Sequence, residues 1–399
     1  MASVPQSNPA APIRWTAFLK DVFICSLGAY GGPEAHVGVF LDQLVARRHY
    51  LEENELIELV ALCSLLPGPT STQTIVAVGH KLGGPRLALL TMLVWALPAL
   101  GVMTLLSFLY QFLDARAISR DTLRFLGPLA VGFIVVAAFR IGRKVVVDLP
   151  TAALMLFGAG ATWFIRAPWI FPAVLLAGGA TTLLAGRRPG LWTRVRLDPP
   201  WRPLALFAAL ALGLLLLAML TGHRLAILAE SFYRYGYLVF GGGQVVVPLM
   251  HDELVQWRGY MTHAEFLTGY GLVQGLPGPM FSFAAYAGGM AARGGTPLVQ
   301  ILGAVAGGVG IFLPGLLLIF FVYPVWETLR QIPAIRLALR GVNAVAGGLI
   351  AIAAVILLQA GGFRPEPLAA TALAIALLAT RRFPAPLLVA TALAAGFVR

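Results

Sequence analysis

Long apolar runs without a charged residue are the feature that most restricts how this chain can fold. Windows free of Asp, Glu, Lys and Arg include 87–113, 167–186, 203–222, 296–326 and 341–363. A helix needs roughly 20 apolar residues to cross a bilayer, and these runs reach that length. Hydrophobic types make up 59% of the chain and charged types 12%, unlike a soluble domain. A transmembrane β-barrel would instead show short alternating strands. The sequence therefore predicts an all-α integral membrane protein.

The chain contains an internal repeat. Residues 30–73 align with residues 240–283 at a constant offset of 210 without a gap, and 14 of the 44 aligned pairs are identical. After a further shift of six residues the match resumes, with Pro98 paired to Pro314 and Arg124 to Arg340. Self-similarity of this kind indicates a tandem duplication.

We expect four regions: an N-terminal tail at 1–13, a first repeat at 14–186, a basic linker with one linking span at 187–224, and a second repeat at 225–399. Each repeat is expected to hold about six spans. They lie near 15–32, 55–82, 86–113, 122–139, 145–165 and 168–186, then near 225–242, 265–292, 296–326, 334–358, 367–380 and 383–398. Thirteen spans would invert the second repeat relative to the first, as in many secondary transporters. The alternative is that 55–82 and 265–292 are re-entrant hairpins, which changes the number of crossings.

The basic residues indicate an orientation in the membrane. Lys and Arg number 29 against 17 Asp and Glu, a formal net charge of +12. With the N-terminus in the cytoplasm, the thirteen-span topology places 18 basic residues inside and 10 outside, as the positive-inside rule requires. The C-terminus is then outside. The basic linker around Trp192 and Trp201 fits a loop at the lipid surface, so we expect no nucleic-acid partner.

Two Pro-Gly-Pro breaks interrupt apolar helical segments at equivalent positions, Pro67-Gly68-Pro69 and Pro277-Gly278-Pro279. Two prolines around a glycine end a helix, because each removes a backbone donor and restricts the preceding residue. New half-helices would begin at Thr70 and Met280, with their free amides and positive dipole ends inside the membrane. Such ends bind anions. The first is lined by Thr70, Ser71, Thr72 and Gln73, whereas Met280 and Phe281 begin the second, so we expect an asymmetric site. The alternative is a kinked helix pair whose hydroxyls only cap the break.

A glycine motif ends the first predicted span of each repeat. These motifs are Gly31-Gly32-Pro33, followed by Glu34 and His36, and Gly241-Gly242-Gly243, followed by Gln244 and Pro248. The functional interpretation packs these glycines against the Pro-Gly-Pro breaks and lines an access path or gate with the polar residues; the alternative is a tight turn. Arg234 lies within a predicted span between Tyr233 and Tyr235, and either attracts the substrate or forms a structural ion pair.

Motifs of enzymes and metal sites are absent from the sequence. It has no Walker phosphate loop, no HExxH zinc motif and no GxSxG nucleophile motif. Cys25 and Cys63 lie in apolar runs without CxxC spacing. We therefore expect no cofactor, no metal and no catalytic residues.

The segments SLGAYGGPEAHVG and LPGPTSTQ in the first repeat, with VFGGGQVVVPL and GLVQGLPGPMFSFAAYAGG in the second, resemble the chromate ion transporter family in its long, two-domain form. The resemblance covers nearly the whole chain. It implies export of chromate, a tetrahedral oxyanion, across the inner membrane of a prokaryotic cell, powered by the membrane gradient and giving chromate resistance. The matching positions are Gly31, Gly32, Pro33, His36, Pro67, Gly68, Pro69, Ser71, Gln73, Gly241, Gly242, Gly243, Pro248, Gln274, Pro277, Gly278 and Pro279.

Three positions depart from the family pattern. Tyr30, Ser64 and Gln244 stand where Phe, Gln and His are expected. One alternative keeps the fold and changes the cargo to sulfate or another oxyanion. An alternative of another class is a non-transporting membrane scaffold or an intramembrane enzyme. The expected partners are the oxyanion and the lipid bilayer, and the sequence leaves a homodimer open.

Overall fold

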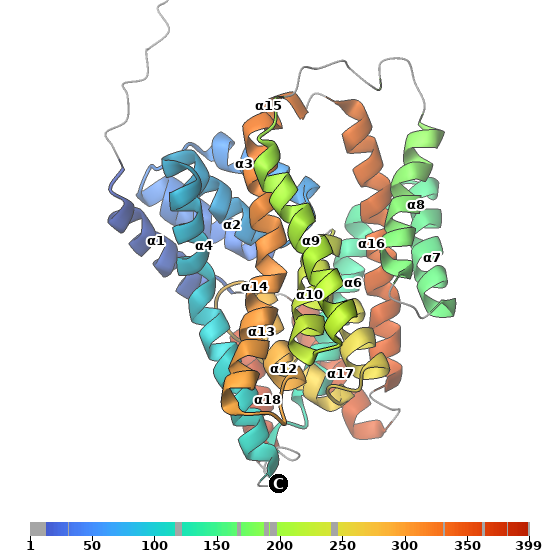
Figure 1. The fold of residues 1–399 in the computed structure, drawn as a ribbon. Helices are drawn as coiled ribbons and strands as arrows, with labels where there is room; N and C mark the ends of the chain where they lie inside the picture. Colours follow the sequence, from blue (N-terminus) through green and yellow to red (C-terminus); the bar gives the residue numbers. More distant parts are fainter. Residues whose placement is uncertain are drawn as a thin grey trace, which may run out of the picture.

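The computed structural model describes residues 13–30, 32–115, 122–165, 169–186, 191, 198–240, 246–329, 332–360, 364–380 and 382–397. Within these ranges every regular element is a helix (Figure 1). The all-α prediction is therefore confirmed. The number and length of the helices differ from the expectation of about six spans in each repeat.

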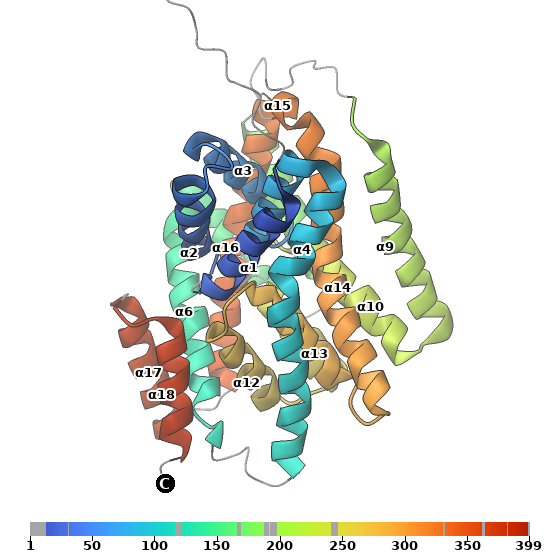
Figure 2. The same ribbon diagram turned by 90° about the vertical axis from the view of Figure 1, so that its left-hand side faces the viewer.

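Five helices are long and apolar enough to cross a membrane in the described part of the chain. They are α4 (Thr70–Ala115), α6 (Leu126–Val145), α9 (Trp201–Thr221), α14 (Pro297–Val322) and α16 (Pro333–Ala360). Figures 1 and 2 show that all five run roughly along the vertical axis of the molecule; α4 descends after its interruption at Gly83 and Gly84, and α14 ascends. The predicted linking span is α9, which buries none of its residues in the protein.

The remaining helices are short. In the first repeat they are α1 (Trp15–Gly28), α2 (Pro33–Phe40), π-helical η1 (Leu41–Arg47), α3 (Glu53–Leu65), α7 (Leu149–Phe164) and α8 (Ile170–Ala185). In the second they are α10 (Arg224–Leu238), α11 (Val246–His251), π-helical η3 (Asp252–Trp257), α12 (His263–Gln274), η4 (Met280–Ser282), α13 (Phe283–Ala291), η5 (Tyr323–Val325), α15 (Trp326–Leu329), α17 (Pro365–Ala379) and α18 (Ala385–Phe397). A helix of 16 residues extends about 24 Å, short of the roughly 30 Å hydrocarbon core. Six full spans in each repeat therefore stays a prediction, because five long helices and four shorter apolar helices lie in the described part of the chain.

The two segments that contain the Pro-Gly-Pro breaks are hairpins. Glu55 at the start of α3 forms an ion pair with Lys81, near the point where Gly83 and Gly84 interrupt α4. In the second repeat Glu265 at the start of α12 pairs with Arg293, just after α13. A continuous segment would separate the ends of 55–82 by about 40 Å. Each chain segment therefore turns back at its break, which is the re-entrant alternative.

The two repeats interlock through their second halves. Helices α7 and α8 of the first repeat pack on α16 of the second, whereas α17 of the second packs on α6 of the first. Arg340 of the second repeat pairs with Asp148 of the first. Arg124, the first-repeat counterpart of Arg340, pairs with Glu366, which lies near the second-repeat counterpart of Asp148. Hydrogen bonds from Thr151, with a smaller contribution from Arg340, lower the pKa of Asp148. Each repeat therefore packs helices of its second half against the other repeat, and the two repeats do not form separate helix bundles.

The hairpins of the two repeats approach from opposite ends of the molecule. In Figures 1 and 2, α1, α2 and α3 occupy the upper half, and α10, α12 and α13 occupy the lower half. The turns of all these hairpins therefore point toward the middle. The candidate site lies where the turns meet.

Candidate functional site

The Pro-Gly-Pro breaks are turns that require glycine. Gly68 has φ +122° and Gly278 has φ +101°, conformations that side-chain-bearing residues adopt only with strain. In the first repeat the break separates α3 from α4, and in the second it separates α12 from η4 and α13. The sequence prediction of two broken segments holds at this local level.

Each break is bonded to the other repeat. The Gly68 N–H donates to the Val239 carbonyl at 2.8 Å, and the Gly278 N–H donates to the Ala29 carbonyl at 2.9 Å. Gly68 and Gly278 are separated by the repeat offset of 210, and so are Ala29 and Val239. The two hydrogen bonds are therefore equivalent, and they join each break to the residue that precedes the other repeat's glycine motif by two positions.

Each break also lies against the long helix of the other repeat. A Cβ atom added at Gly68 would lie 3.5 Å from the Gly315 Cα in α14, and one added at Gly278 would lie 3.1 Å from the Ala99 Cβ in α4. These two helix residues directly follow Pro314 and Pro98, which are equivalent prolines. Each break thus meets two chain segments of the other repeat.

A buried polar cluster surrounds the start of α4 in the first repeat. Ser71 Oγ and His36 Nδ1 share a hydrogen bond of 2.9 Å, and Trp95 Nε1–H donates to Thr72 Oγ1 at 3.1 Å. The first helical bond in this turn is from the Gln73 amide to the Pro69 carbonyl, so the amides of the preceding three residues lie outside the helical ladder. Because the indole nitrogen only donates, the Thr72 hydroxyl keeps its own proton for another acceptor.

Gln73 folds back over the first break. Its Nε2 donates to the Pro67 carbonyl at 2.8 Å and lies 3.5 Å from the Gly315 carbonyl, so the amide group is at the open end of the helix. Its side-chain oxygen is buried and has no hydrogen-bond partner among the described residues. A buried polar atom of this kind marks a place where a ligand or water can bind.

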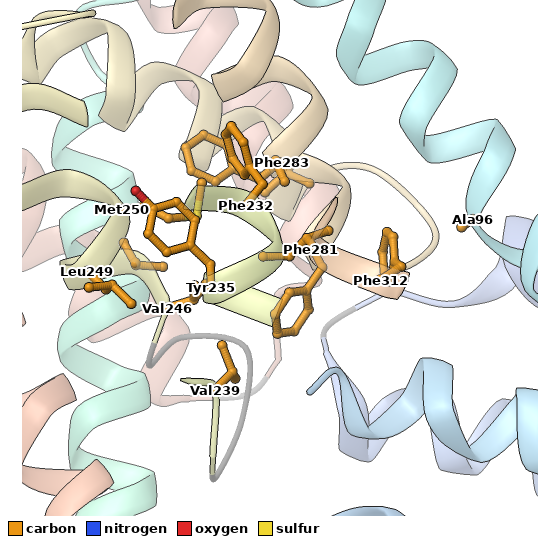
Figure 3. Close-up of a cluster of buried hydrophobic side chains, with 14 of the residues drawn as sticks. Ala96, Phe232, Tyr235, Val239, Val246, Leu249, Met250, Phe281, Phe283 and Phe312 are labelled. Carbon is orange, nitrogen blue, oxygen red and sulfur yellow. The ribbon is translucent and has the colours of Figure 1, made fainter. Parts of the chain in front are cut away.

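The equivalent cluster in the second repeat is largely apolar, although Ser282, at the position of Thr72, keeps a buried hydroxyl that has no hydrogen-bond partner among the described residues. The positions of His36, Phe40, Thr70, Ser71, Gln73 and Trp95 correspond to Val246, Met250, Met280, Phe281, Phe283 and Ile311. These residues line a small cavity together with Tyr270, and Figure 3 shows part of the cluster. Gln274 Nε2 donates to the Met280 sulfur at 3.2 Å, and Pro248 is buried in α11. The polar groups of the predicted site therefore gather in the first repeat.

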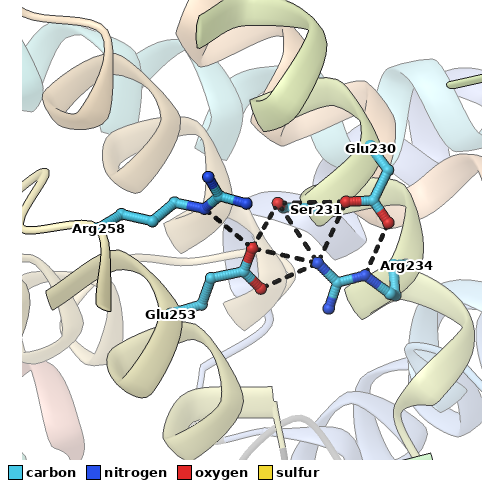
Figure 4. A network of polar contacts seen from close by, with 5 residues as sticks. All are labelled: Glu230, Ser231, Arg234, Glu253 and Arg258. Atoms are coloured by element: carbon cyan, nitrogen blue, oxygen red, sulfur yellow. Dashed lines mark hydrogen bonds and ion pairs between the residues drawn. The ribbon is translucent and has the colours of Figure 1, made fainter. Parts of the chain in front are cut away.

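Arg234 lies between two carboxylates (Figure 4). Its Nε bonds Glu230 Oε1 at 2.7 Å, and its Nη2 bonds Glu253 Oε2 at 2.9 Å. This geometry favours the structural ion pair over direct attraction of a substrate, because two negative charges already neutralise the guanidinium.

The glycine motifs are described only in part. Gly32 has φ +89° and is the N-cap of α2, where His36 projects from the second turn. Gly31, Gly241, Gly242, Gly243 and Gln244 lie outside the described residues, as do the side chains of Pro33 and Glu34. The access path expected from these residues remains a prediction.

Two residues of the cluster were not among the predicted site residues. Trp95 is fully buried and forms edge-to-face contacts with His36 and Phe40. Ser26 is also buried, and its hydroxyl donates to the Trp95 carbonyl at 2.9 Å. The sequence contained one signal for Trp95, because it lies in the middle of the uncharged window 87–113. Tryptophan usually lies near membrane interfaces, so a tryptophan at the centre of a span is a candidate site residue.

The chemistry available here is hydrogen-bond donation to an anion. The cluster offers hydroxyl, indole and backbone N–H groups at a positive helix end. In the described part of the chain, no group of three His, Cys, Asp or Glu residues could hold a metal ion.

Comparison with known proteins gives a consistent result. A family model described as Chromate transporter matches residues 16–183 and 226–397. The chain is 29% identical to a "Chromate transport protein" of Pseudomonas aeruginosa, covering 89% of this chain and 82% of that protein. It is 24% identical to a protein of the same name in Cupriavidus metallidurans, over 92% and 89% of the two chains. It is also 24% identical to an uncharacterized transporter of Methanocaldococcus jannaschii, over 82% and 79%. No solved structure matches the chain.

Proposed function

The chain belongs to the chromate transporter family, and we propose that it exports chromate from the cytoplasm as a secondary transporter with one oxyanion site at the start of α4. The observation that carries this proposal is the reciprocal bonding of the two breaks, Gly68 to Val239 and Gly278 to Ala29. Residues from both repeats thereby enclose one central region, as at the substrate sites of transporters built from inverted repeats.

The oxyanion would bind through the polar cluster of the first repeat. Candidate donors are the first-turn amides of α4, the hydroxyls of Ser71 and Thr72, and the ring of His36, all within or beside the helix end. The second repeat would contribute its break and the apolar wall that includes Phe281 and Phe283. Because anions are stabilised at helix N-termini and by hydroxyl donors, this arrangement selects negative charge without a basic residue in direct contact.

We propose that the N-terminal side of the molecule faces the cytoplasm. With one crossing for each of the five long helices, the start of α1 and the end of α18, which lie at opposite ends of the molecule (Figures 1 and 2), would be on opposite sides of the membrane. Helix ends on the side of α1 carry Arg14, Lys81, Arg86, Arg140, Arg143, Lys144, Arg202, Arg336 and Arg340, whereas those on the other side carry Arg124, Arg224, Arg293 and Arg364. The excess of basic residues on the first side supports this orientation.

The membrane potential supplies the driving force for export. An anion that leaves a negative cell interior gains about 2.3 kcal/mol per charge for each 100 mV. Export therefore needs no nucleotide site, which agrees with the absence of a Walker loop from the sequence.

Uptake of radiolabelled chromate into inverted membrane vesicles tests the proposal. We expect accumulation that depends on an imposed gradient and on the presence of the protein. Absence of any accumulation would refute the transport function and favour the scaffold or enzyme alternative. Full competition by sulfate would assign the site to tetrahedral oxyanions in general, whereas weak competition would assign it to chromate.

A further inference from the structure

The start of each repeat forms a hairpin whose first leg is α1 or α10 and whose returning leg is α2 with η1 or α11 with η3. In the first repeat a buried carboxylate connects the two legs of this hairpin. Asp21 in α1 accepts hydrogen bonds from Gln43 Nε2 at 2.8 Å, from Arg48 Nε at 3.0 Å and from Tyr50 OH at 2.7 Å. The Asp21 side chain is fully buried. Gln43 lies in η1, and the other two donors follow directly after it. One carboxylate thus holds the returning leg of the hairpin against α1.

The second repeat has a similar cluster with the carboxylate on the other leg (Figure 4). Glu253 in η3 accepts from Ser231 Oγ of α10 at 2.8 Å and from Arg258 Nε at 3.2 Å, in addition to Arg234. Its side chain is 3% exposed. The carboxylate again connects the first leg of the hairpin, α10, with the returning leg.

The repeat offset shows that these clusters are equivalent. At an offset of 210, Asp21 corresponds to Ser231, Gln43 to Glu253 and Arg48 to Arg258. The acidic residue has moved from the first leg to the second, and a neutral hydrogen-bonding residue has moved the other way. Both copies also place the second leg in a π-helix, a rare form that often occurs at functional positions.

We propose that Asp21 with Arg48 and Glu253 with Arg258 are positioning residues for transport, which hold each hairpin so that its turn meets the Pro-Gly-Pro break of the other repeat. In the first repeat the turn of this hairpin contains Ala29, whose carbonyl accepts from the Gly278 N–H. In the second repeat the turn of the equivalent hairpin contains Val239, whose carbonyl accepts from the Gly68 N–H. When a buried carboxylate fixes the two legs of the hairpin to each other, the turn keeps a fixed position relative to the Pro-Gly-Pro break of the other repeat. This inference rests on the proposed transport function.

The carboxylate lies on opposite legs of the hairpin in the two repeats, and this difference allows a test in which a second substitution restores the activity lost by the first. Asp21→Ser leaves Gln43, Arg48 and Tyr50 without their acceptor. We expect the rate of chromate uptake per transporter to fall about tenfold or more, because several hydrogen bonds to one buried charged group are lost together. Adding Gln43→Glu recreates the Ser231, Glu253 and Arg258 part of the cluster in the second repeat, although Ile24 stands at the position of Arg234. The double variant should recover most of the rate and the wild-type KM.

The same test applies in the second repeat. Glu253→Gln should lower the rate, and Ser231→Asp added to it should restore part of the loss. The matched control is Asp42→Asn, which removes the exposed partner of Arg47 at 2.9 Å on the same π-helix and should leave uptake unchanged. The amount of each variant in the membrane is measured in parallel, because a residue that only supports folding would change that amount and not the rate per molecule.

Three results would overturn the inference. They are normal uptake by Asp21→Ser, a double variant no better than Asp21→Ser, and a loss in the single variants that disappears after correction for protein amount. If the single variants do not reach the membrane, recovery of both insertion and rate in the double variants still supports the inference, and recovery of insertion alone contradicts it. Wild-type protein without uptake would refute the proposed function instead, so the two failures are distinguishable.

Discussion

Replacement of Gly68 by alanine should impair transport more than any other single methyl addition at the breaks. Gly68 has φ +122°, where an L-residue is strained by roughly 1–3 kcal/mol. The new Cβ would also lie 2.9 Å from Gln73 Nε2, which forces the amide away from the Pro67 carbonyl that it now bonds. Loss of that hydrogen bond costs about 1 kcal/mol.

The two contributions amount to about 2–4 kcal/mol against the conformation seen here. If transport passes through this conformation, the rate should fall between about thirtyfold and about a thousandfold, since each 1.4 kcal/mol is tenfold. Gly278→Ala should be milder. Its φ of +101° brings similar strain, but its Cβ would lie 3.1 Å from the Ala99 Cβ and 3.7 Å from the Ser26 hydroxyl, an ordinary contact distance, so it displaces no hydrogen-bonded side chain.

The assay is chromate uptake into inverted vesicles, corrected for the amount of transporter. Gly101→Ala in α4 is the matched control, because a Cβ there has nothing within 4 Å and no positive φ is recorded for that residue. Alanine should even favour the helix at this position by about 1 kcal/mol. Wild-type uptake by Gly68→Ala, or a larger loss in Gly101→Ala, would refute the reasoning and make the break a purely architectural turn.

Further predictions concern the hairpin and the polar cluster. In a background without Cys25 and Cys63, single cysteines at Glu55 and Lys81 should react with an impermeant maleimide from the same side of the membrane; labelling from opposite sides would contradict the hairpin. Burial opposes ionisation of Glu55, but the hydrogen bond from Lys81 and that from the Glu52 amide lower the pKa of Glu55 below its ordinary 4.5. The stability that this ionised group adds is therefore constant above pH 4.5 and lost on further acidification, and Lys81→Met should weaken this acid dependence in thermal unfolding; an unchanged profile would contradict it. Trp95→Phe keeps most of the ring packing but removes the donor to Thr72, so the KM for chromate should rise about fivefold, from the roughly 1 kcal/mol of one hydrogen bond; an unchanged KM would remove Trp95 from the site.

Local chemistry explains which features of the site were predictable. A single proline such as Pro98 can stay within a helix, but two prolines around a glycine, as at Pro67 and Pro69, end one. The break and the new helix start at Thr70 therefore followed from the sequence alone. The pairing of Arg234 with Glu230 was also within reach, since the two are four residues apart on one helix. Glu253 belongs to another element, and nothing in the spacing indicates that it meets Arg234.

The topology could not be read from the same evidence. A segment such as 55–82 has the length and hydropathy of a span whether it continues past its break or turns back. The difference depends on the backbone angles of the few residues around Gly68 and on contacts such as Glu55 with Lys81. Hydropathy measures how apolar a segment is and carries no information about its direction.

The sequence by itself determined the membrane class, the duplication and the two breaks, because composition, self-similarity and the stereochemistry of proline are properties of the chain that do not depend on the fold. Only the tertiary structure decided that the breaks are hairpin turns, that Gly68 bonds Val239 while Gly278 bonds Ala29, and that the polar residues gather around Trp95 on one side. These contacts join residues of opposite repeats, or of helices far apart in the chain. They exist because buried backbone and side-chain polar groups in a membrane protein must find partners inside the protein, and the fold determines which partners are within reach.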